Sequence, residues 1–149
     1  MLVRAASPGD EHRIVELIIE LAVFEKEPHA VKNNPEKLRK DLFEKKLCEA
    51  FVGEVDGMIQ GYAIYYTSYS TWNGPCLYLE DIYVSEAHRQ SGLGSLLFDT
   101  VKNEAVTRNV PRMDWQILAW NELALEFYER KGATIDKDWV NGRLFFDLE

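Results

Sequence analysis

Residues 77–95 read LYLEDIYVSEAHRQSGLGS, and this stretch decides how the chain folds. Residues 77–84 are mostly β-branched, aromatic or aliphatic, which predicts a strand. Gly92 and Gly94 follow, just before an apolar pattern with helical spacing. Glycines between a strand and a helix let backbone amides converge on an anion, although many helices also begin with glycine only for close packing. The stretch therefore favours an α/β fold with a candidate anion-binding loop.

Outward from this stretch, the hydrophobic periodicity alternates between strand and helix along the whole chain. Strands are predicted over residues 2–5, 50–55, 58–69, 76–84, 112–119 and 143–148. Helices are predicted from the Ser7 N-cap to Glu25, from Asn34-Pro35, from the glycine loop to before Pro111, and from the Asn121 cap to Lys131. In the third helix the inward positions are Leu93, Leu96, Leu97, Val101 and Ala105. This order predicts one α/β domain over residues 1–149, built around a single sheet.

The composition of the chain indicates which classes of molecule it is expected to bind and which it is expected to repel. The 149 residues hold 17 Lys and Arg against 25 Asp and Glu, a net charge of −8 and a pI of about 4.9. Such a chain repels nucleic acid and anionic membranes and attracts cationic ligands. It has no apolar run long enough to span a bilayer and no signal peptide, so a cytoplasmic location is expected. Its two cysteines and three histidines lack metal-ligand spacing, so no metal is expected.

The sequence of the glycine loop does not match either of two common phosphate-binding motifs. No Lys follows Gly94, as a P-loop requires, and the glycines come too late in the chain for a dinucleotide-binding first β-α unit. Arg89-x-x-Gly92-x-Gly94 instead resembles the acyl-CoA loop of the GNAT N-acetyltransferases. The resemblance covers the whole chain, including the order of elements. It implies a mixed, mostly antiparallel central sheet flanked by helices, and acetyl-CoA as co-substrate.

Four further stretches resemble the spermidine/spermine N-acetyltransferase group, and most closely its thialysine branch. They are YSTWNG (69–74), YLEDIYV (78–84), Trp120-Asn121 and FYERKGA (127–133). The resemblance implies direct attack of an amine on the thioester of acetyl-CoA, and a homodimer.

Two residues are expected to move protons. An alkyl ammonium has a pKa near 10.4, so a base must remove a proton before attack. We expect Glu80, an acid in an apolar strand, to act directly or through water, unless it pairs with a core cation. Asp81 points to the opposite face of a regular strand, and a bulge would bring both acids inward. By resemblance Tyr128 is the acid that protonates the departing thiolate; otherwise it is a core aromatic beside Phe127.

The resemblance also assigns contacts with acetyl-CoA. The backbone of Ile82, Tyr83 and Val84 would bind the pantetheine and acetyl groups, with the Val84 amide polarising the carbonyl. Asn121 would bind the pantetheine, a role compatible with capping its helix. The full set of expected contacts comprises Ile82, Tyr83, Val84, Arg89, Gln90, Ser91, Gly92, Leu93, Gly94, Ser95, Asn121 and Ala124. Gln90 replaces a glycine common in this loop, a change we expect to be tolerated.

On the acceptor side the resemblance implies Phe24 and Glu25, together with Glu80 and Asp81. Glu25 could equally be a solvated acid at a helix end. Ser70, Val140 and Gly142 stand where the polyamine enzymes carry two acids and a tryptophan, so a long polycation would lose anionic partners. We therefore expect an acetyl-CoA-dependent enzyme acting on a small primary amine, such as thialysine, a lysine-like compound or a short diamine. The alternatives are a spermidine/spermine acetyltransferase, a protein or peptide acetyltransferase and, from another class, a non-catalytic CoA-binding sensor.

Overall fold

The computed structural model describes residues 1–148 and contains two compact units, residues 1–116 and the chain from Ile117 onward. The first unit holds the whole sheet with three of the helices, and the second holds α4 and the C-terminal segment. Among the described residues no helix is both long and apolar enough to cross a membrane.

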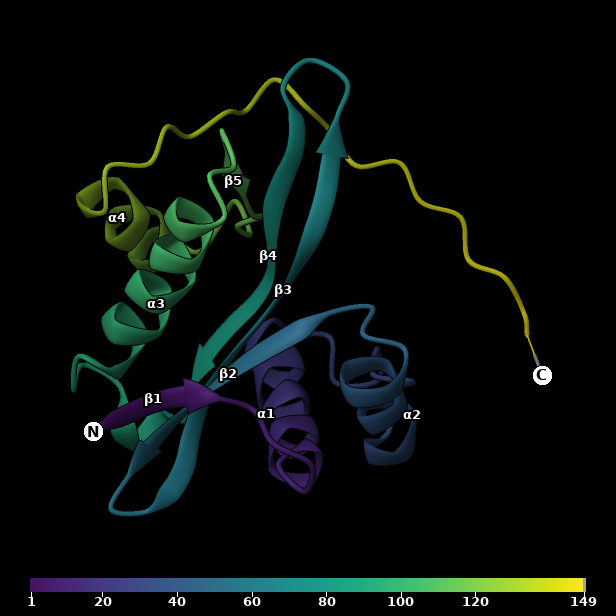
Figure 1. The fold of residues 1–149 in the computed structure, drawn as a ribbon, viewed down its shortest axis with the longest axis vertical. Coiled ribbons are helices and arrows are strands. Elements are labelled where there is room, and N and C mark those ends of the chain that lie inside the picture. The colour runs from purple at the N-terminus through teal and green to yellow at the C-terminus, as the bar shows by residue number, and fades with distance from the viewer. Residues whose placement is uncertain (149) are drawn as a thin grey trace. The chain divides into compact units, whose positions relative to one another are not determined.

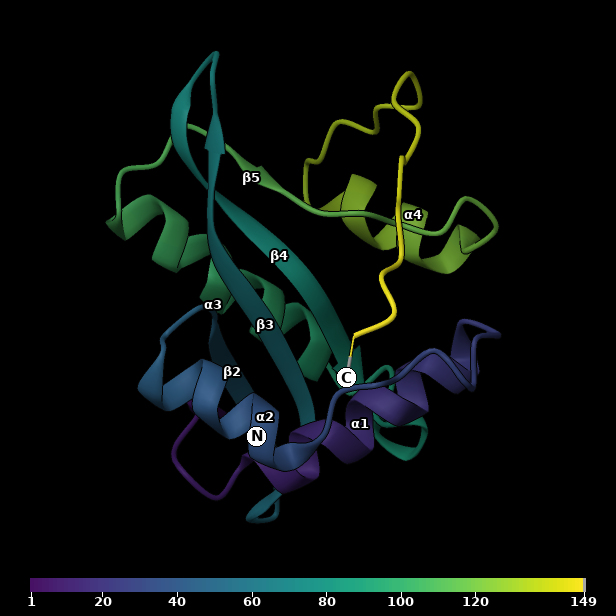
Figure 2. The ribbon, with the colours of Figure 1, turned by 90° about the vertical axis from the view of Figure 1, so that its right-hand side faces the viewer.

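The sheet of the first unit is mixed and mostly antiparallel, as predicted. Its strands lie in chain order, antiparallel from β1 to β4, with β5 parallel to β4. Their bounds are β1 (Leu2–Ala5), β2 (Glu49–Val55), β3 (Met58–Ser70), β4 (Gly74–Val84) and β5 (Met113–Asp114). The strand predicted over residues 112–119 is therefore much shorter than expected. Strands β3 and β4 form a long hairpin whose tip extends beyond β1 and β2 (Figures 1 and 2).

The helices follow the predicted order. Their bounds are α1 (Glu11–Phe24), α2 (Pro35–Arg39), the π-helical turn η1 (Lys40–Glu44), the 3-10 turn η2 (Glu86–His88), α3 (Leu93–Thr107) and α4 (Glu122–Arg130). The predicted Asn121 cap is confirmed, since its side chain accepts a hydrogen bond from the Ala124 amide at 3.1 Å. Asn34, predicted only to begin its helix, also caps it by accepting from the Lys37 amide at 2.9 Å. Such caps satisfy backbone donors that a helix start leaves without partners.

The predicted Ser7 cap is wrong, because α1 begins only at Glu11. The Asp10 carboxylate accepts hydrogen bonds from the Ser7 amide at 2.8 Å and from the Arg4 guanidinium at 2.7 Å. Residues 7–10 thus form a turn tied to β1, which delays the helix. The hydrogen bond from Arg4 is the main reason that the pKa of Asp10 is lowered.

The two faces of the sheet carry different helices, α1 and α2 on one and α3 on the other (Figure 1). Tyr62, Ile64 and Tyr83 pack with α1 and α2 into a buried cluster. On the other face Gly53 and Gly61 leave room for α3. A Cβ atom at Gly53 would lie 2.6 Å from Leu93 Cδ1, and one at Gly61 would lie 3.0 Å from Leu97 Cδ1. These glycines therefore bring the start of α3 close to the sheet.

The inward face of α3 is largely as predicted. Leu93, Leu97, Val101 and Ala105 are buried, but Leu96 is 39% exposed. The buried residues share one side of the helix with Phe98, and Leu96 projects from a different side. The prediction for Leu96 was therefore wrong.

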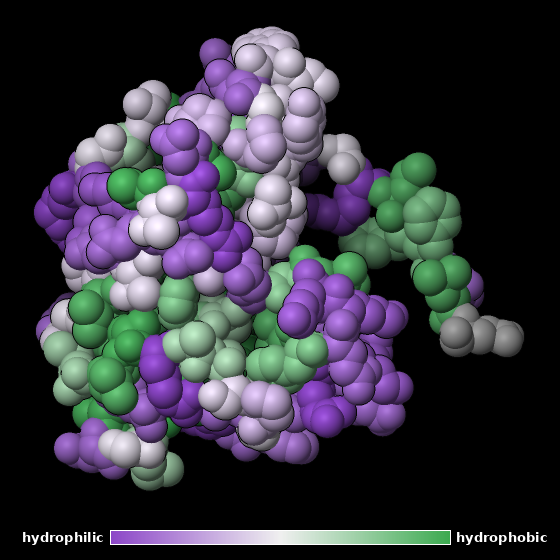
Figure 3. All heavy atoms as spheres, in the orientation of Figure 1, coloured by the Kyte–Doolittle hydropathy of each residue, from purple (hydrophilic) through white to green (hydrophobic). Residues whose placement is uncertain are grey.

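The strand predicted over residues 143–148 is also wrong, since the described C-terminal segment after α4 has no regular secondary structure. Its apolar side chains are largely exposed; Phe145, for example, is 90% exposed. Figure 3 shows this as a run of apolar surface along the segment. An apolar pattern favours a strand only where neighbours bury it, and here the side chains are not buried.

Candidate functional site

A β-bulge in β4 sets the orientation of the two adjacent acids. Asp81 pairs with Ile64 and Leu79 with Tyr65, so Glu80 is the extra residue between two register positions. A bulge of this kind re-aims side chains next to it. Paired residues of an antiparallel ladder point to the same face, so Asp81 lies with Ile64 on the face that carries α1 and α2. The bulge considered from the sequence is thus present, but it does not bring both acids inward, because Glu80 is exposed.

The Asp81 carboxylate is held by a buried tyrosine. The Tyr62 hydroxyl donates a hydrogen bond to Asp81 Oδ2 at 3.1 Å, and the Tyr62 side chain is fully buried. The pKa of Asp81 is raised to about 6: burial is the main cause, the hydrogen bond from Tyr62 opposes the shift, and the charge of Glu80 adds to it. This carboxylate therefore changes charge close to neutral pH.

Glu25, one of the residues expected to bind the acceptor, lies close enough to Asp81 for their charges to interact. Glu25 caps the C-terminal end of α1, and its pKa is raised first by burial and then by the charge of Asp81. Glu25 is therefore not a fully solvated helix-end acid, the alternative considered from the sequence. Phe24 is the last residue of α1 and lies beside it.

Glu80 is exposed, unlike its neighbour Leu79. Burial is the main cause that raises the pKa of Tyr66 and of Tyr78, and the charge of Glu80 is the second cause for both. The ring centroids of these two tyrosines lie 5.2 Å apart. Among residues 1–148 no ion pair includes Glu80, so the alternative of a core cation partner finds no support there. Glu80 and Asp81 thus form one acidic region at the bulge.

Arg89 bridges the end of β4 and the end of α1. Its Nη2 donates to the Tyr83 hydroxyl at 3.0 Å, and its Nε donates to the Val84 carbonyl at 3.3 Å. Its guanidinium carbon lies 4.9 Å from the ring centroid of Phe24 and 5.3 Å from that of Tyr83. The contact with acetyl-CoA expected for Arg89 stays a prediction, and the structure adds that Arg89 joins the loop before α3 to the end of α1.

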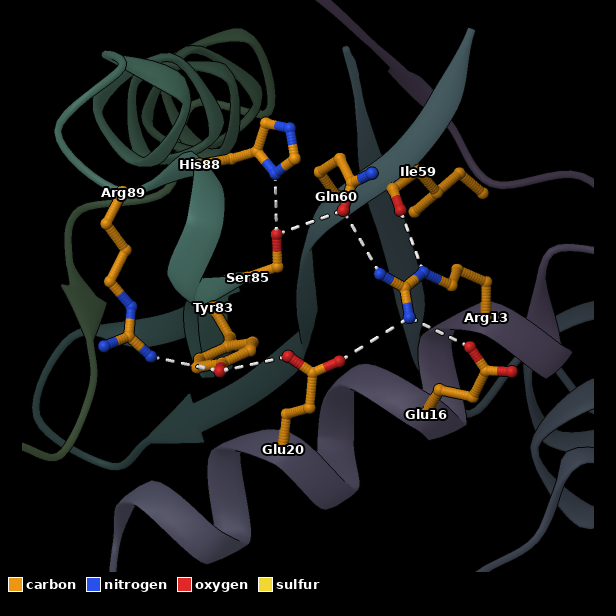
Figure 4. A network of polar contacts seen from close by, with 9 residues as sticks. All are labelled: Arg13, Glu16, Glu20, Ile59, Gln60, Tyr83, Ser85, His88 and Arg89. Atoms are coloured by element: carbon orange, nitrogen blue, oxygen red, sulfur yellow. Dashed lines mark hydrogen bonds and ion pairs between the residues drawn. The ribbon is translucent and has the colours of Figure 1, made fainter. Parts of the chain in front are cut away.

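A polar network extends this bridge through the first unit (Figure 4). The Tyr83 hydroxyl donates to Glu20 of α1 at 3.4 Å, and Glu20 pairs with Arg13 at 3.5 Å. Arg13 in turn donates to the Gln60 side chain at 3.1 Å, which also accepts from the Ser85 hydroxyl at 3.0 Å. The network ties α1 to β3 and to the end of β4.

The far end of the network fixes a histidine tautomer. Because the Ser85 hydroxyl donates to Gln60, it accepts from His88 Nδ1, 3.1 Å away. His88 is therefore held by the network at the start of the loop that precedes α3.

The loop before α3 suits an anionic group. Gln90 and Gly92 have φ of 61° and 94°, so the chain turns sharply through left-handed conformations. Gly92 is the N-cap of α3, and the first turn of α3 holds no acid, whereas α1, α2 and α4 each carry one in the first turn. A helix start without its own carboxylate leaves the amide dipoles to an external anion. These residues fit the anion-binding loop expected from the sequence.

The remaining expected residues lie in the second unit. Asn121 accepts from the Ala124 amide, which fixes both at the start of α4. Tyr128 is buried, and its ring meets that of Phe127 edge-on with centroids 5.1 Å apart. The roles expected for these three residues stay predictions.

Sequence reasoning missed Tyr62 and Glu20 as part of the site. The signal for Tyr62 was present, since a tyrosine inside a buried strand needs a partner for its hydroxyl. That partner depends on the register of β3 against β4, which the sequence leaves open. Ser70, in contrast, has a local role: its hydroxyl accepts from the Trp72 and Asn73 amides at 3.2 and 3.1 Å in the turn of the hairpin.

Within the described residues, no group of three or more His, Cys, Asp or Glu side chains could hold a metal ion.

Comparisons with known proteins agree with this geometry. Residues 13–133 match the family model described as the acetyltransferase (GNAT) family. The thialysine N-epsilon-acetyltransferase of Bos taurus is 37% identical over 142 residues, which cover 89% of this chain and 84% of that protein. The enzyme of the same name from Caenorhabditis elegans is 34% identical over 141 residues, covering 93% and 88%. A solved structure titled as a probable acetyltransferase superposes with a TM-score of 0.79 at 24% identity over both whole chains, which shows a shared fold.

Proposed function

The chain belongs to the acetyltransferase (GNAT) family, and we propose that it transfers the acetyl group of acetyl-CoA to a primary amine of a small molecule. Thialysine, a lysine-like amine or a short diamine is the acceptor class that we favour. The observation that carries the proposal is the acidic region at the β4 bulge, where the Asp81 carboxylate lies close enough to Glu80 and to Glu25, at the end of α1, for their charges to interact. Carboxylates so placed attract an ammonium group.

The proposed roles follow the direction of proton flow. When bound, acetyl-CoA supplies the thioester whose C–S bond breaks as the amine nitrogen forms the amide. Glu80 removes the proton of the ammonium, directly or through a water. The Val84 amide donates to the acetyl oxygen as negative charge develops there. Tyr128 gives its proton to the CoA thiolate and regains one from solvent.

The donor is proposed to lie along the end of β4 and the start of α3. The backbone of Ile82, Tyr83 and Val84 would hold its pantetheine arm, together with Asn121 and Ala124. Arg89 and the amides from Gln90 to Ser95 would hold its phosphates, which the left-handed turn and the acid-free first turn of α3 support.

A short acceptor is favoured by the hairpin turn. Ser70 stands where the polyamine enzymes carry an acid, and its hydroxyl is used within the turn. A long polycation requires several spaced anionic partners, and this chain offers it fewer of them than the polyamine enzymes do. The names of the relatives from Bos taurus and Caenorhabditis elegans support the same acceptor class. The proposal also places the protein in the cytoplasm as a homodimer.

A panel of acceptors tests the proposal. Release of CoA from acetyl-CoA is followed with thialysine, lysine, putrescine, spermidine, spermine and a lysine peptide. We expect the highest kcat/KM with thialysine or a short diamine. A preference for spermidine or spermine would favour the polyamine alternative, and preference for the peptide would favour a protein acetyltransferase. Binding of acetyl-CoA without turnover on any amine would favour a CoA-binding sensor.

A further inference from the structure

Tyr62 lies in a cluster of otherwise mostly apolar buried side chains. Its side chain is 0% exposed and belongs to the apolar cluster that β3 forms with α1 and α2. A phenol in such a place costs free energy unless its hydroxyl is hydrogen-bonded. Its hydroxyl reaches Asp81 Oδ2 at 3.1 Å, so the tyrosine brings one polar group through the core to one carboxylate.

The register of β3 and β4 makes this contact possible. Tyr62 pairs with Tyr83 and Ile64 pairs with Asp81, so the bond runs diagonally across the two strands. In a regular strand without the bulge, the side chains of Glu80 and Asp81 would point to opposite faces of the sheet. The bulge and the phenol together fix where the Asp81 carboxylate points.

The hydrogen bond leaves part of Asp81 for another partner. A carboxylate has about four acceptor positions on its two oxygens, and the Tyr62 hydroxyl occupies one, on Oδ2. The charged groups that face Asp81 are acidic: Glu80 on its own strand and Glu25 on α1, with the phenols of Tyr62 and Tyr78 beside them. A bound ammonium would relieve the repulsion among these carboxylates.

From this geometry we infer that Tyr62 is a positioning residue for the acceptor amine: its hydroxyl orients the Asp81 carboxylate, which then pairs with the ammonium group. The inference rests on the proposed function and adds a residue to it. Tyr62 itself does not touch the reacting atoms. It acts through Asp81, while Glu80 remains the proposed base.

The test compares Tyr62→Phe with Tyr65→Phe. Tyr65 is a matched control because it is a buried tyrosine on the same strand, on the opposite face, stacked on Phe51 with ring centroids 5.4 Å apart. Binding of thialysine is measured by calorimetry in the presence of CoA, which does not require turnover. Steady-state kinetics with acetyl-CoA and thialysine then separate KM from kcat.

We expect Tyr62→Phe to weaken thialysine binding and raise its KM on the order of tenfold, the loss expected for a hydrogen bond to a charged group. The kcat and the KM for acetyl-CoA should stay within about twofold. Because the phenol lowers the pKa of Asp81, its loss should also move the acidic limb of kcat/KM to higher pH. Tyr65→Phe should change none of these quantities.

Three results would overturn the inference: unchanged thialysine affinity in Tyr62→Phe, an equal rise in the KM for acetyl-CoA, or the same loss in Tyr65→Phe. An additional loss when Tyr62→Phe is made in an Asp81→Asn background would also contradict it, since Tyr62 is inferred to act only through Asp81. Absence of acetyl transfer by the wild type, with thialysine still bound and its affinity reduced in Tyr62→Phe, would instead refute the proposed function alone.

Discussion

At the scale of single residues, Asp81 and Glu80 show how neighbours in sequence receive different surroundings. Asp81 is partly buried and bonded to Tyr62, whereas Glu80 is exposed beside Tyr66 and Tyr78. The sequence indicated both as candidate acids of the site. It could raise a bulge only as an alternative, because the bulge depends on how β4 pairs with β3.

Replacing Asp81 by Asn should stabilise the protein at neutral pH. Burial raises the pKa of Asp81 from 3.8 to about 6 in the folded state, so the folded protein binds this proton more tightly than the unfolded chain does. The contribution of Asp81 to wild-type stability should therefore fall as the pH rises from 4 through 6, by at most about 3 kcal/mol for a shift of this size. Denaturant unfolding of both proteins at pH 7.5 and pH 4 measures the difference. An Asn variant with the same advantage at both values would show that charge is not the cause.

Two further substitutions test the proton transfers. Tyr128→Phe should lower kcat strongly, by about 10² or more, with acetyl-CoA affinity near that of the wild type. Unchanged turnover in Tyr128→Phe would remove its role as acid.

Glu80→Gln should depress activity at neutral pH, and the activity should recover partly at high pH, where free amine is plentiful. A loss of activity that does not depend on pH would instead indicate that Glu80 is a structural acid.

At the scale of elements, the order of strands and helices could be predicted where the residues of an element themselves show its hydrophobic period or its cap. Asn121 caps its helix as predicted, and the helix predicted from Asn34-Pro35 begins there, because helix starts depend on local interactions. The Ser7 cap was wrong because Arg4, in β1, holds Asp10 in a turn. The last strand was wrong because alternation alone cannot show whether a neighbour buries the apolar residues.

The start of α3 depends on two glycines in β2 and β3. An Ala at Gly53 would bring its Cβ to 2.6 Å from the fully buried Leu93, and one at Gly61 would meet the Tyr83 carbonyl oxygen at 3.0 Å. We expect each substitution to destabilise the protein by about 1–3 kcal/mol and to weaken acetyl-CoA binding by shifting the loop before α3. Gly142→Ala is the control, since nothing lies within 4 Å of its Cβ position. Normal acetyl-CoA affinity in both sheet variants would show that the loop does not depend on this packing.

At the scale of the whole molecule, the C-terminal segment exposes apolar surface that an isolated chain rarely keeps (Figure 3). Leu144, Phe145, Phe146 and Leu148 are each at least 75% exposed. The homodimer stays a proposal, in which the second chain would cover apolar side chains of this kind. Light scattering should give twice the chain mass of 17.2 kDa, and replacing Phe145 and Phe146 by Ser should shift the protein toward the monomer. A wild-type monomer at micromolar concentration would contradict the proposal.

The acidic balance of the chain agrees with the acceptor that we propose. A net charge of −8 favours approach of cations, and the carboxylates at the β4 bulge give that attraction a defined place. The sequence could predict this preference and the loop before α3. It could not predict Tyr62 as the partner of Asp81, because that contact depends on a register between two strands.

The most direct test of the central claim is a mass spectrum of thialysine after incubation with the protein and acetyl-CoA carrying a labelled acetyl group. The account predicts that thialysine gains one labelled acetyl group on its side-chain amine, with an equal amount of CoA released. Thialysine recovered without the label, although acetyl-CoA binds to the protein, would contradict the account.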